Sequence, residues 1–184
     1  VGLSEGEPVP LSPYLLSAFE AVDRRFENWV DSIASGGQWL FFSVKYKLGN
    51  SDPSIVNPSQ MLEYSMVIRL AELYAIRAEA RAKLNNIEGS KTDLNTLRQR
   101  AHLTPITTDD PAALLTQLYR ERQVEFFTEW GHRWIDLKRS GTINTVMPSI
   151  THAKGGSWED TDQLYPIPWE DLLHNPKLHQ NKGY

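Results

Sequence analysis

The sequence contains no cysteine among its 184 residues. This absence excludes thiolate catalysis, cysteine-ligated zinc and disulfide bonds. No apolar run approaches the ~20 residues that a membrane-spanning helix needs. The net charge is -4 at pH 7, and Lys and Arg are not clustered, so the sequence argues against a nucleic-acid partner, which would require concentrated positive charge.

Recognised cofactor and catalytic signatures are also absent. The sequence has no GxGxxG, GxxxxGK[ST] or GxSxG segment, and its five histidines never fall at HExxH spacing. We therefore expect no cofactor, no metal and no catalytic residue. The chain begins with Val and has no basic-then-apolar signal segment, so we expect a processed protein or a fragment of a longer one.

Hydrophobic periodicity places a helical body at residues 61–141. A helix over residues 66–84 carries a broad apolar arc, which predicts packing against more than one neighbour. Ser90 and Asp93 resemble a capping box that opens a second helix.

Asp110 followed by Pro111 predicts the start of a third helix. It runs to about Phe127, and past a kink at Gly131 it continues to residue 139, where Gly141 ends it. Successive helices of this kind predict tetratricopeptide-like stacking of helical hairpins.

The flanking regions are less regular. In residues 1–60 we expect a short helix over 14–22 and a loop at 50–58, with two paired strands between them. The strands are predicted by the aromatic and β-branched runs at 26–30 and 39–46, on either side of a glycine pair. Residues 142–184 form an irregular tail with one helical turn at 169–173. The prediction is one mainly α domain over residues 1–184, with irregular loops and a few short strands.

Five charged residues recur on one face of the third helix at spacings of 3, 4, 4 and 3. They are Arg122, Glu125, Glu129, Arg133 and Asp136. Two carboxylates one turn apart suggest a glycosidase pair, but flanking arginines would lower both carboxyl pKa values, whereas a general acid needs a raised one. We interpret the column as an ion network that locks the helix to its neighbours.

Aromatic residues outside the regular helices are the candidate ligand contacts. Sugars dock their apolar C–H faces on flat rings and their hydroxyls on polar side chains. The candidates, in segments predicted as strand or loop, are Trp29, Trp39, Tyr46 and Trp158.

Four ordered motifs resemble the carboxy-terminal region of the SusD/RagB family. They are RLAE with AEA at residues 69–80, NTLRQRA at 95–101, the segment from Glu121-Arg122 to DLKR at 136–139, and YPIP, NP and QNKGY between 165 and 184. Asp23, Arg25 and Lys45-Tyr46 fit weaker upstream markers. Trp130 stands where the family commonly has Glu.

This resemblance implies a tetratricopeptide-like body that carries irregular ligand-binding segments. Family members are surface-exposed lipoproteins of the outer membrane that bind glycans or peptides, without catalysis, for import by a SusC-like TonB-dependent transporter. Their lipid anchor would lie outside this chain. The motifs mark scaffold and transfer no ligand contact. Two other readings stay open: a helical adaptor that binds only protein, and a glycosidase using Glu125 and Glu129.

Overall fold

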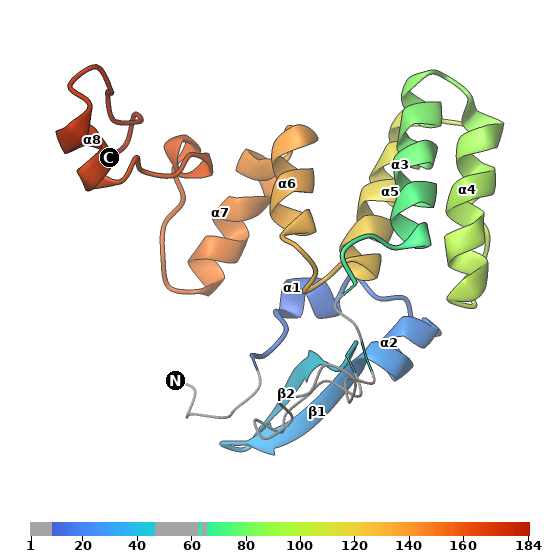
Figure 1. Cartoon of the computed structure of the whole chain (residues 1–184). Coiled ribbons are helices and arrows are strands. Elements are labelled where there is room, and N and C mark those ends of the chain that lie inside the picture. The colour runs from blue at the N-terminus through green and yellow to red at the C-terminus, as the bar shows by residue number, and fades with distance from the viewer. Residues whose placement is uncertain (1–8, 47–62, 64–65) are drawn as a thin grey trace. The chain divides into compact units, whose positions relative to one another are not determined.

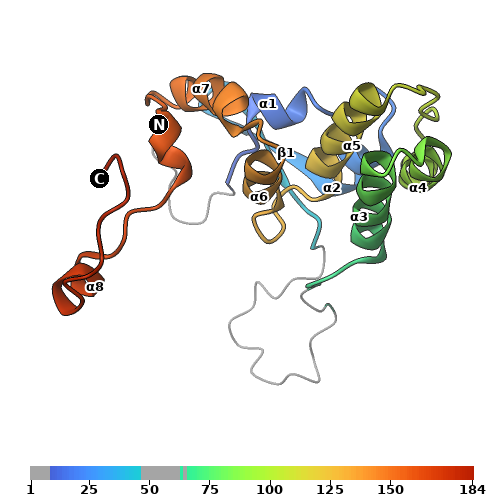
Figure 2. The ribbon, with the colours of Figure 1, turned by 90° about the horizontal axis from the view of Figure 1, so that it is seen from above.

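Three helices form the centre of the first of two compact units in the computed structural model, which describes residues 9–46, 63 and 66–184. Unit 1 is Val1–Trp130 and unit 2 is Gly131–Tyr184. The three helices are α3 (Leu70–Lys83), α4 (Ile87–Arg100) and α5 (Pro111–Glu125). Helix α3 packs against both α4 and α5, as its broad apolar arc predicted, and the three lie side by side in Figure 1 and, seen from above, in Figure 2.

Small side chains allow this close packing. The buried face of α3 presents four alanines, which are Ala71, Ala75, Ala78 and Ala82. Ala78 and Ala82 contact Leu94 of α4 and two buried leucines of α5. The Ser90 hydroxyl donates a hydrogen bond of 2.7 Å to the Ala78 carbonyl, which also joins α4 to α3.

Ser90 therefore lies inside a helix, and the predicted capping box is wrong. Helix α4 begins earlier, where the Asn86 side chain accepts a hydrogen bond from the Gly89 amide. Asp93 instead binds two arginines of α3. The start of α5 is confirmed, because Asp110 caps it and Pro111 follows.

The third predicted helix does not continue to residue 139. It ends at Glu125, and Thr128, Trp130 and Gly131 then take positive φ angles of 59°, 41° and 71°. A new helix, α6 (His132–Arg139), begins in unit 2. The five charged residues therefore do not share one helical face, since Glu129 lies outside both helices.

The aminoterminal segment contains less helix at 14–22 and less strand at 26–30 than predicted. Helix α1 covers only Pro13–Leu16, and α2 covers Arg24–Trp29. Asp23 caps α2, and the i, i+3 spacing of Phe26 and Trp29 allows their rings to contact Phe19 and Phe127. The strand was predicted from residue type, whereas residues three positions apart share a face only in a helix.

A strand pair forms directly after α2, with its first strand at 30–35 instead of the predicted 26–30 and its second at 38–43, within the predicted region around 39–46. Strands β1 (Val30–Ser35) and β2 (Gln38–Ser43) are antiparallel, with Ser35 opposite Gln38. Gly36 and Gly37 have φ angles of 57° and 79°, as a tight two-residue turn requires. The predicted loop at 50–58 lies outside the described residues.

Unit 2 contains α6, α7 (Ile143–Ala153), a 3₁₀ turn at Asp160–Gln163 and α8 (Trp169–His174). The short helix at the predicted position 169–173 is confirmed as α8. Helix α7 was not predicted, because Pro148 lies inside it and its threonines have low helix propensity. The mainly helical fold class is confirmed.

Candidate functional site

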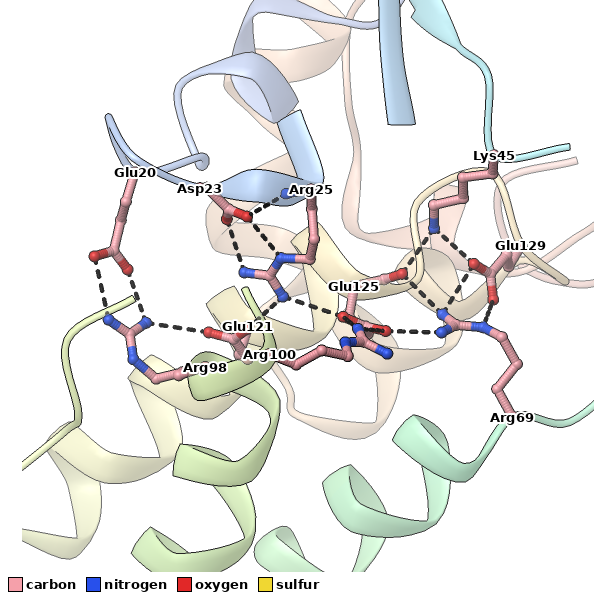
Figure 3. A network of polar contacts seen from close by, with 10 residues as sticks. All are labelled: Glu20, Asp23, Arg25, Lys45, Arg69, Arg98, Arg100, Glu121, Glu125 and Glu129. Atoms are coloured by element: carbon pink, nitrogen blue, oxygen red, sulfur yellow. Dashed lines mark hydrogen bonds and ion pairs between the residues drawn. The ribbon is translucent and has the colours of Figure 1, made fainter. Parts of the chain in front are cut away.

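An ion network of ten residues occupies the end of unit 1 where α2 meets α3, α4 and α5 (Figure 3). It contains five acids and five bases. The acids are Glu20, Asp23, Glu121, Glu125 and Glu129, and the bases are Arg25, Lys45, Arg69, Arg98 and Arg100. Opposite charges in equal number balance the network, so that its inner members Arg25, Glu121 and Glu125 can be buried.

The Glu125 carboxylate is at the centre of the ion network and is fully buried. Arg100 donates to both of its oxygens at 2.6 Å, Arg69 to one at 2.7 Å and Arg25 to the other at 3.1 Å. Arg25 also binds Glu121 and, through a bidentate contact, Asp23. These contacts join α2, α4, α5 and the start of α3.

The pKa of Glu125 opposes a catalytic role for this residue. Burial alone would raise the pKa of Glu125, but Arg100, Arg69 and Arg25 outweigh it and hold this pKa below its ordinary value. Burial raises the pKa of Glu121, which lies against Arg25 and Arg98. Glu125 therefore lacks both the exposure and the raised pKa of a general acid, as expected for a network that locks helices together.

A cleft of about 330 Å³ opens beside one end of the ion network. It brings together two of the four predicted aromatic contacts. Its lining residues are Trp29, Lys45, Tyr46, Glu63, Met66, Arg69 and Glu129. A concave site with aromatic walls and a few convergent polar groups is the usual form of a small-molecule site.

Lys45 is a basic residue of the cleft whose side chain is buried. Its ammonium donates to Glu129 at 2.6 Å and to the Glu125 carbonyl at 2.7 Å. Burial lowers the pKa of Lys45 to about 8, although the hydrogen bond to Glu129 opposes the shift. At neutral pH the cleft therefore contains a mostly protonated ammonium that is already paired with a carboxylate.

The two aromatic residues of the cleft differ in accessibility. Trp29 is half-buried and lies at the end of α2, although it was predicted to lie on a strand. The charged groups of Lys45, Arg100 and Arg69 lie 4.7, 5.6 and 5.9 Å from the centre of its ring. Tyr46 is 45% exposed, and its hydroxyl accepts a hydrogen bond from the Met66 amide. Tyr46 is therefore the more accessible ring.

The other two predicted aromatic contacts lie elsewhere. Trp39 is on β2, opposite Ala34, and is 66% exposed. Trp158 belongs to unit 2, in a loop as predicted, and its indole N–H donates to Asn144 at 3.2 Å. Only Trp29 and Tyr46 share the cleft.

A second, larger groove of about 920 Å³ follows α4 and the chain after it. Its lining residues include no Trp, Tyr or Phe and no Asp, Glu, Lys or Arg. The lining residues are Thr92, Asn95, Thr96, Gln99, His102, Leu103 and Pro105. Because no Trp, Tyr or Phe ring lines this groove, the smaller cleft is the better candidate for ligand recognition.

A sequence model of the SusD family matches residues 34–184. The chain belongs to the SusD family. The resemblance seen in the motifs is thereby confirmed over these residues. The structure of this SusD-family chain is also similar to a SusD superfamily protein from Bacteroides vulgatus, with a TM-score of 0.71 and 19% identity over 95% of this chain and 44% of that one, which establishes the shared fold.

Two named relatives are similar to this SusD-family chain in sequence. The starch-binding protein SusD of Bacteroides thetaiotaomicron is 36% identical over 125 residues, which are 64% of this chain and 21% of that protein. Surface glycan-binding protein A of Bacteroides uniformis is 26% identical, with a TM-score of 0.64 over 94% of this chain and 40% of that one. The chain thus spans only a minor part of these relatives.

Sequence reasoning did not assign Lys45 and Arg69 to a site, although both belong to motifs of the SusD family. Arg69 contacts Glu125 and Glu129, which lie 56 and 60 positions away. No local pattern reports a pairing over such a separation. The signal that the sequence offered was the place of both residues in those motifs.

The described part of the SusD-family chain contains neither a metal-binding cluster nor a membrane-spanning helix. Among residues 9–46, 63 and 66–184, no three His, Cys, Asp or Glu side chains gather where a metal ion could be held. Within the same residues, no helix has the length and apolar character to span a bilayer.

Proposed function

We propose that this chain is part of a glycan-binding protein that captures an extracellular nutrient without chemical turnover. The observation that carries the proposal is the match to the SusD family over residues 34–184. Relatives are named for starch binding and for surface glycan binding, which supports an oligosaccharide as ligand, with a peptide as the other ligand considered.

The cleft beside the ion network is the proposed site in unit 1. Tyr46 offers an accessible ring for the C–H face of a sugar, and Arg69 and Glu129 offer charged groups for its hydroxyls. Trp39 on the neighbouring hairpin is a further exposed ring. Trp29 supports the cleft wall in this proposal, since cations already face its ring.

We further propose the cellular setting that the SusD family implies. The intact protein would be held by a lipid anchor on the outer-membrane surface, and its partner would be a SusC-like TonB-dependent transporter. The buried and ion-paired state of Glu125 supports a binding role over a glycosidase.

Isothermal titration calorimetry with neutral oligosaccharides, including maltoheptaose, tests the proposal. We expect saturable binding to at least one glycan, and about tenfold weaker binding for Tyr46→Ala, which removes an exposed aromatic contact. Tyr14→Ala, in α1 of the same unit, is the matched control and should bind like wild type. A failure of every glycan to bind the unmodified chain would refute the proposal.

A helical adaptor that binds only protein is the second candidate. Leu70, Leu73 and Ile76 of α3 are each more than half exposed and lie on one helical face. An adaptor predicts capture of a protein partner that Leu73→Gln abolishes, with no calorimetric response to any sugar.

A further inference from the structure

Unit 2 contains an aromatic cluster that the proposed cleft does not use. The Trp134 ring centre lies 6.1 Å from that of Trp158, edge to face, and 5.9 Å from that of Tyr165. The Lys138 ammonium lies 5.8 Å from the Trp134 ring centre. Four side chains from α6 and two later segments therefore meet at one place in unit 2.

The inner part of this cluster is anchored. Trp134 and Trp158 are both half-buried, and the Trp158 indole N–H donates to the Asn144 side chain. Tyr165 differs, because 69% of it is exposed even though its ring contacts Trp134. The cluster thus presents one accessible ring on a support of two packed ones.

Hydrogen bonds from the C-terminal residues fix the backbone on either side of Tyr165. The Asn181 side-chain amide donates a hydrogen bond of 2.7 Å to the Tyr165 carbonyl, and the Tyr184 hydroxyl donates one of 2.8 Å to the Leu164 carbonyl. Gln180 accepts from the Ile167 amide and donates to its carbonyl, at 2.8 and 2.9 Å. These contacts hold the segment to the last residues of the chain.

Two prolines add to this rigidity. Pro166 and Pro168 restrict the backbone between Tyr165 and Trp169, which begins α8 and is 70% exposed. The backbone that carries the two exposed rings is therefore restricted, and the Tyr165 ring also contacts Trp134. A rigid ring loses little entropy when a ligand stacks on it, which is the property that recognition of a flexible sugar requires.

The geometry points to a second carbohydrate platform in unit 2, in which Tyr165 and Trp169 stack against the pyranose rings of a neutral oligosaccharide. Trp134 acts as a positioning residue that supports the Tyr165 ring. This inference rests on the proposed function, because both take an oligosaccharide as ligand, but it assigns different residues in a different unit.

Two-dimensional NMR of the full chain separates the two sites. The probes are maltoheptaose, cellohexaose, xylohexaose and mannohexaose, and the readouts are the backbone amides of Tyr46, Tyr165 and Trp169 and the Trp134 indole. With at least one probe we expect saturable shifts at Tyr165, Trp169 and Trp134. Binding at this platform should weaken about tenfold in Tyr165→Ala and remain in Tyr165→Phe, which keeps the ring.

Control variants and contrary outcomes follow from the same spectra. Leu173→Ala, an exposed apolar change on α8, should leave the platform shifts unchanged, whereas Trp169→Ala should weaken them even if Tyr165→Ala fails to fold. Shifts at Tyr46 without shifts at Tyr165 and Trp169 would overturn this inference and leave the cleft intact. Shifts at neither site with all four probes would overturn both proposals, and platform shifts with an unstructured peptide alone would also refute the platform.

Discussion

Glu125 shows how a single buried carboxylate organises its surroundings. It receives hydrogen bonds from three arginines that come from α2, α4 and the residue before α3. Removing one partner of a buried charge cluster leaves the others desolvated without compensation, which costs more than an exposed pair contributes. Glu125 is therefore expected to affect stability far more than any exposed acid.

Replacement of Glu125 by Gln tests this expectation. We predict that Glu125→Gln lowers the free energy of unfolding by about 3 kcal/mol at pH 7, measured by urea denaturation. Exposed Glu27→Gln in α2 is the control and should change it by less than about 0.5 kcal/mol. Equal effects of the two substitutions would contradict the central role of Glu125.

The same pair of proteins gives a signed pH dependence. The folded-state pKa of Glu125 is lowered, so its stabilising contribution is present above the ordinary value of 4.5 and is lost as pH falls through the folded value. The stability gap between wild type and Glu125→Gln should therefore shrink as the pH is lowered below 4.5.

Sequence alone assigned Glu125 and Glu129 to an ion network but did not identify their partners. Of the five charged residues predicted to form an ion network, Glu125 and Glu129 are among its ten members, whereas Arg122, Arg133 and Asp136 are not. Arg25 and Arg69 lie 100 and 56 positions from Glu125, and no periodicity connects them. Contacts between segments so far apart depend on the tertiary fold.

At the scale of helices, the alanines of α3 determine how closely its neighbours approach. Ala78 is fully buried against Leu94 and against Leu114 and Leu118 of α5. The hydrogen bond from the Ser90 hydroxyl to the Ala78 carbonyl also holds α4 close to this position. Enlarging this residue must therefore displace α4 or α5.

Ala78→Leu is predicted to destabilise the chain by about 1–3 kcal/mol through overpacking. Ala80→Leu, on the exposed side of the same helix, adds the same atoms where they face solvent. It should therefore change the free energy of unfolding by less than about 0.5 kcal/mol. Thermal or urea denaturation of both variants measures the difference. A comparable loss in Ala80→Leu would show that the cause is not packing.

Local signals predicted some elements and not others for identifiable reasons. Asp110 and Pro111 fixed the start of α5, and Gly36-Gly37 fixed the hairpin turn, because each residue type meets a backbone requirement. Helix α2 was predicted as a strand, since its aromatic residues suit both structures. Helix α7 escaped detection because Pro148, a residue type that disfavours a helix interior, lies within it.

At the scale of the molecule, the outer face of α3 remains uncovered. Leu70, Leu73 and Ile76 are exposed to 67%, 54% and 51%, although comparable leucines of α4 and α5 are fully buried. The chain spans 21% of the starch-binding relative that it matches. An apolar face of this kind favours association with other apolar surfaces.

The double substitution Leu73→Gln with Ile76→Gln is predicted to reduce concentration-dependent association and dye binding. Sedimentation velocity and the fluorescence of a hydrophobic dye measure these properties. The free energy of unfolding should change by less than about 1 kcal/mol, because both side chains already face water. Leu84→Gln, just past the end of α3, is the control, and an equal effect there would argue against a specific face.

The burial of the ion network has a consequence for the environments that the fold tolerates. At an ionic strength of 0.1 M, dissolved salt screens interactions between exposed charges that lie more than about 10 Å apart. Buried ion pairs are screened much less, because salt ions do not reach them. Arg25, Glu121 and Glu125 are each at most 3% exposed in their side chains. The arrangement of α2 against α4 and α5 should therefore be the same at high salt concentration as at low salt concentration.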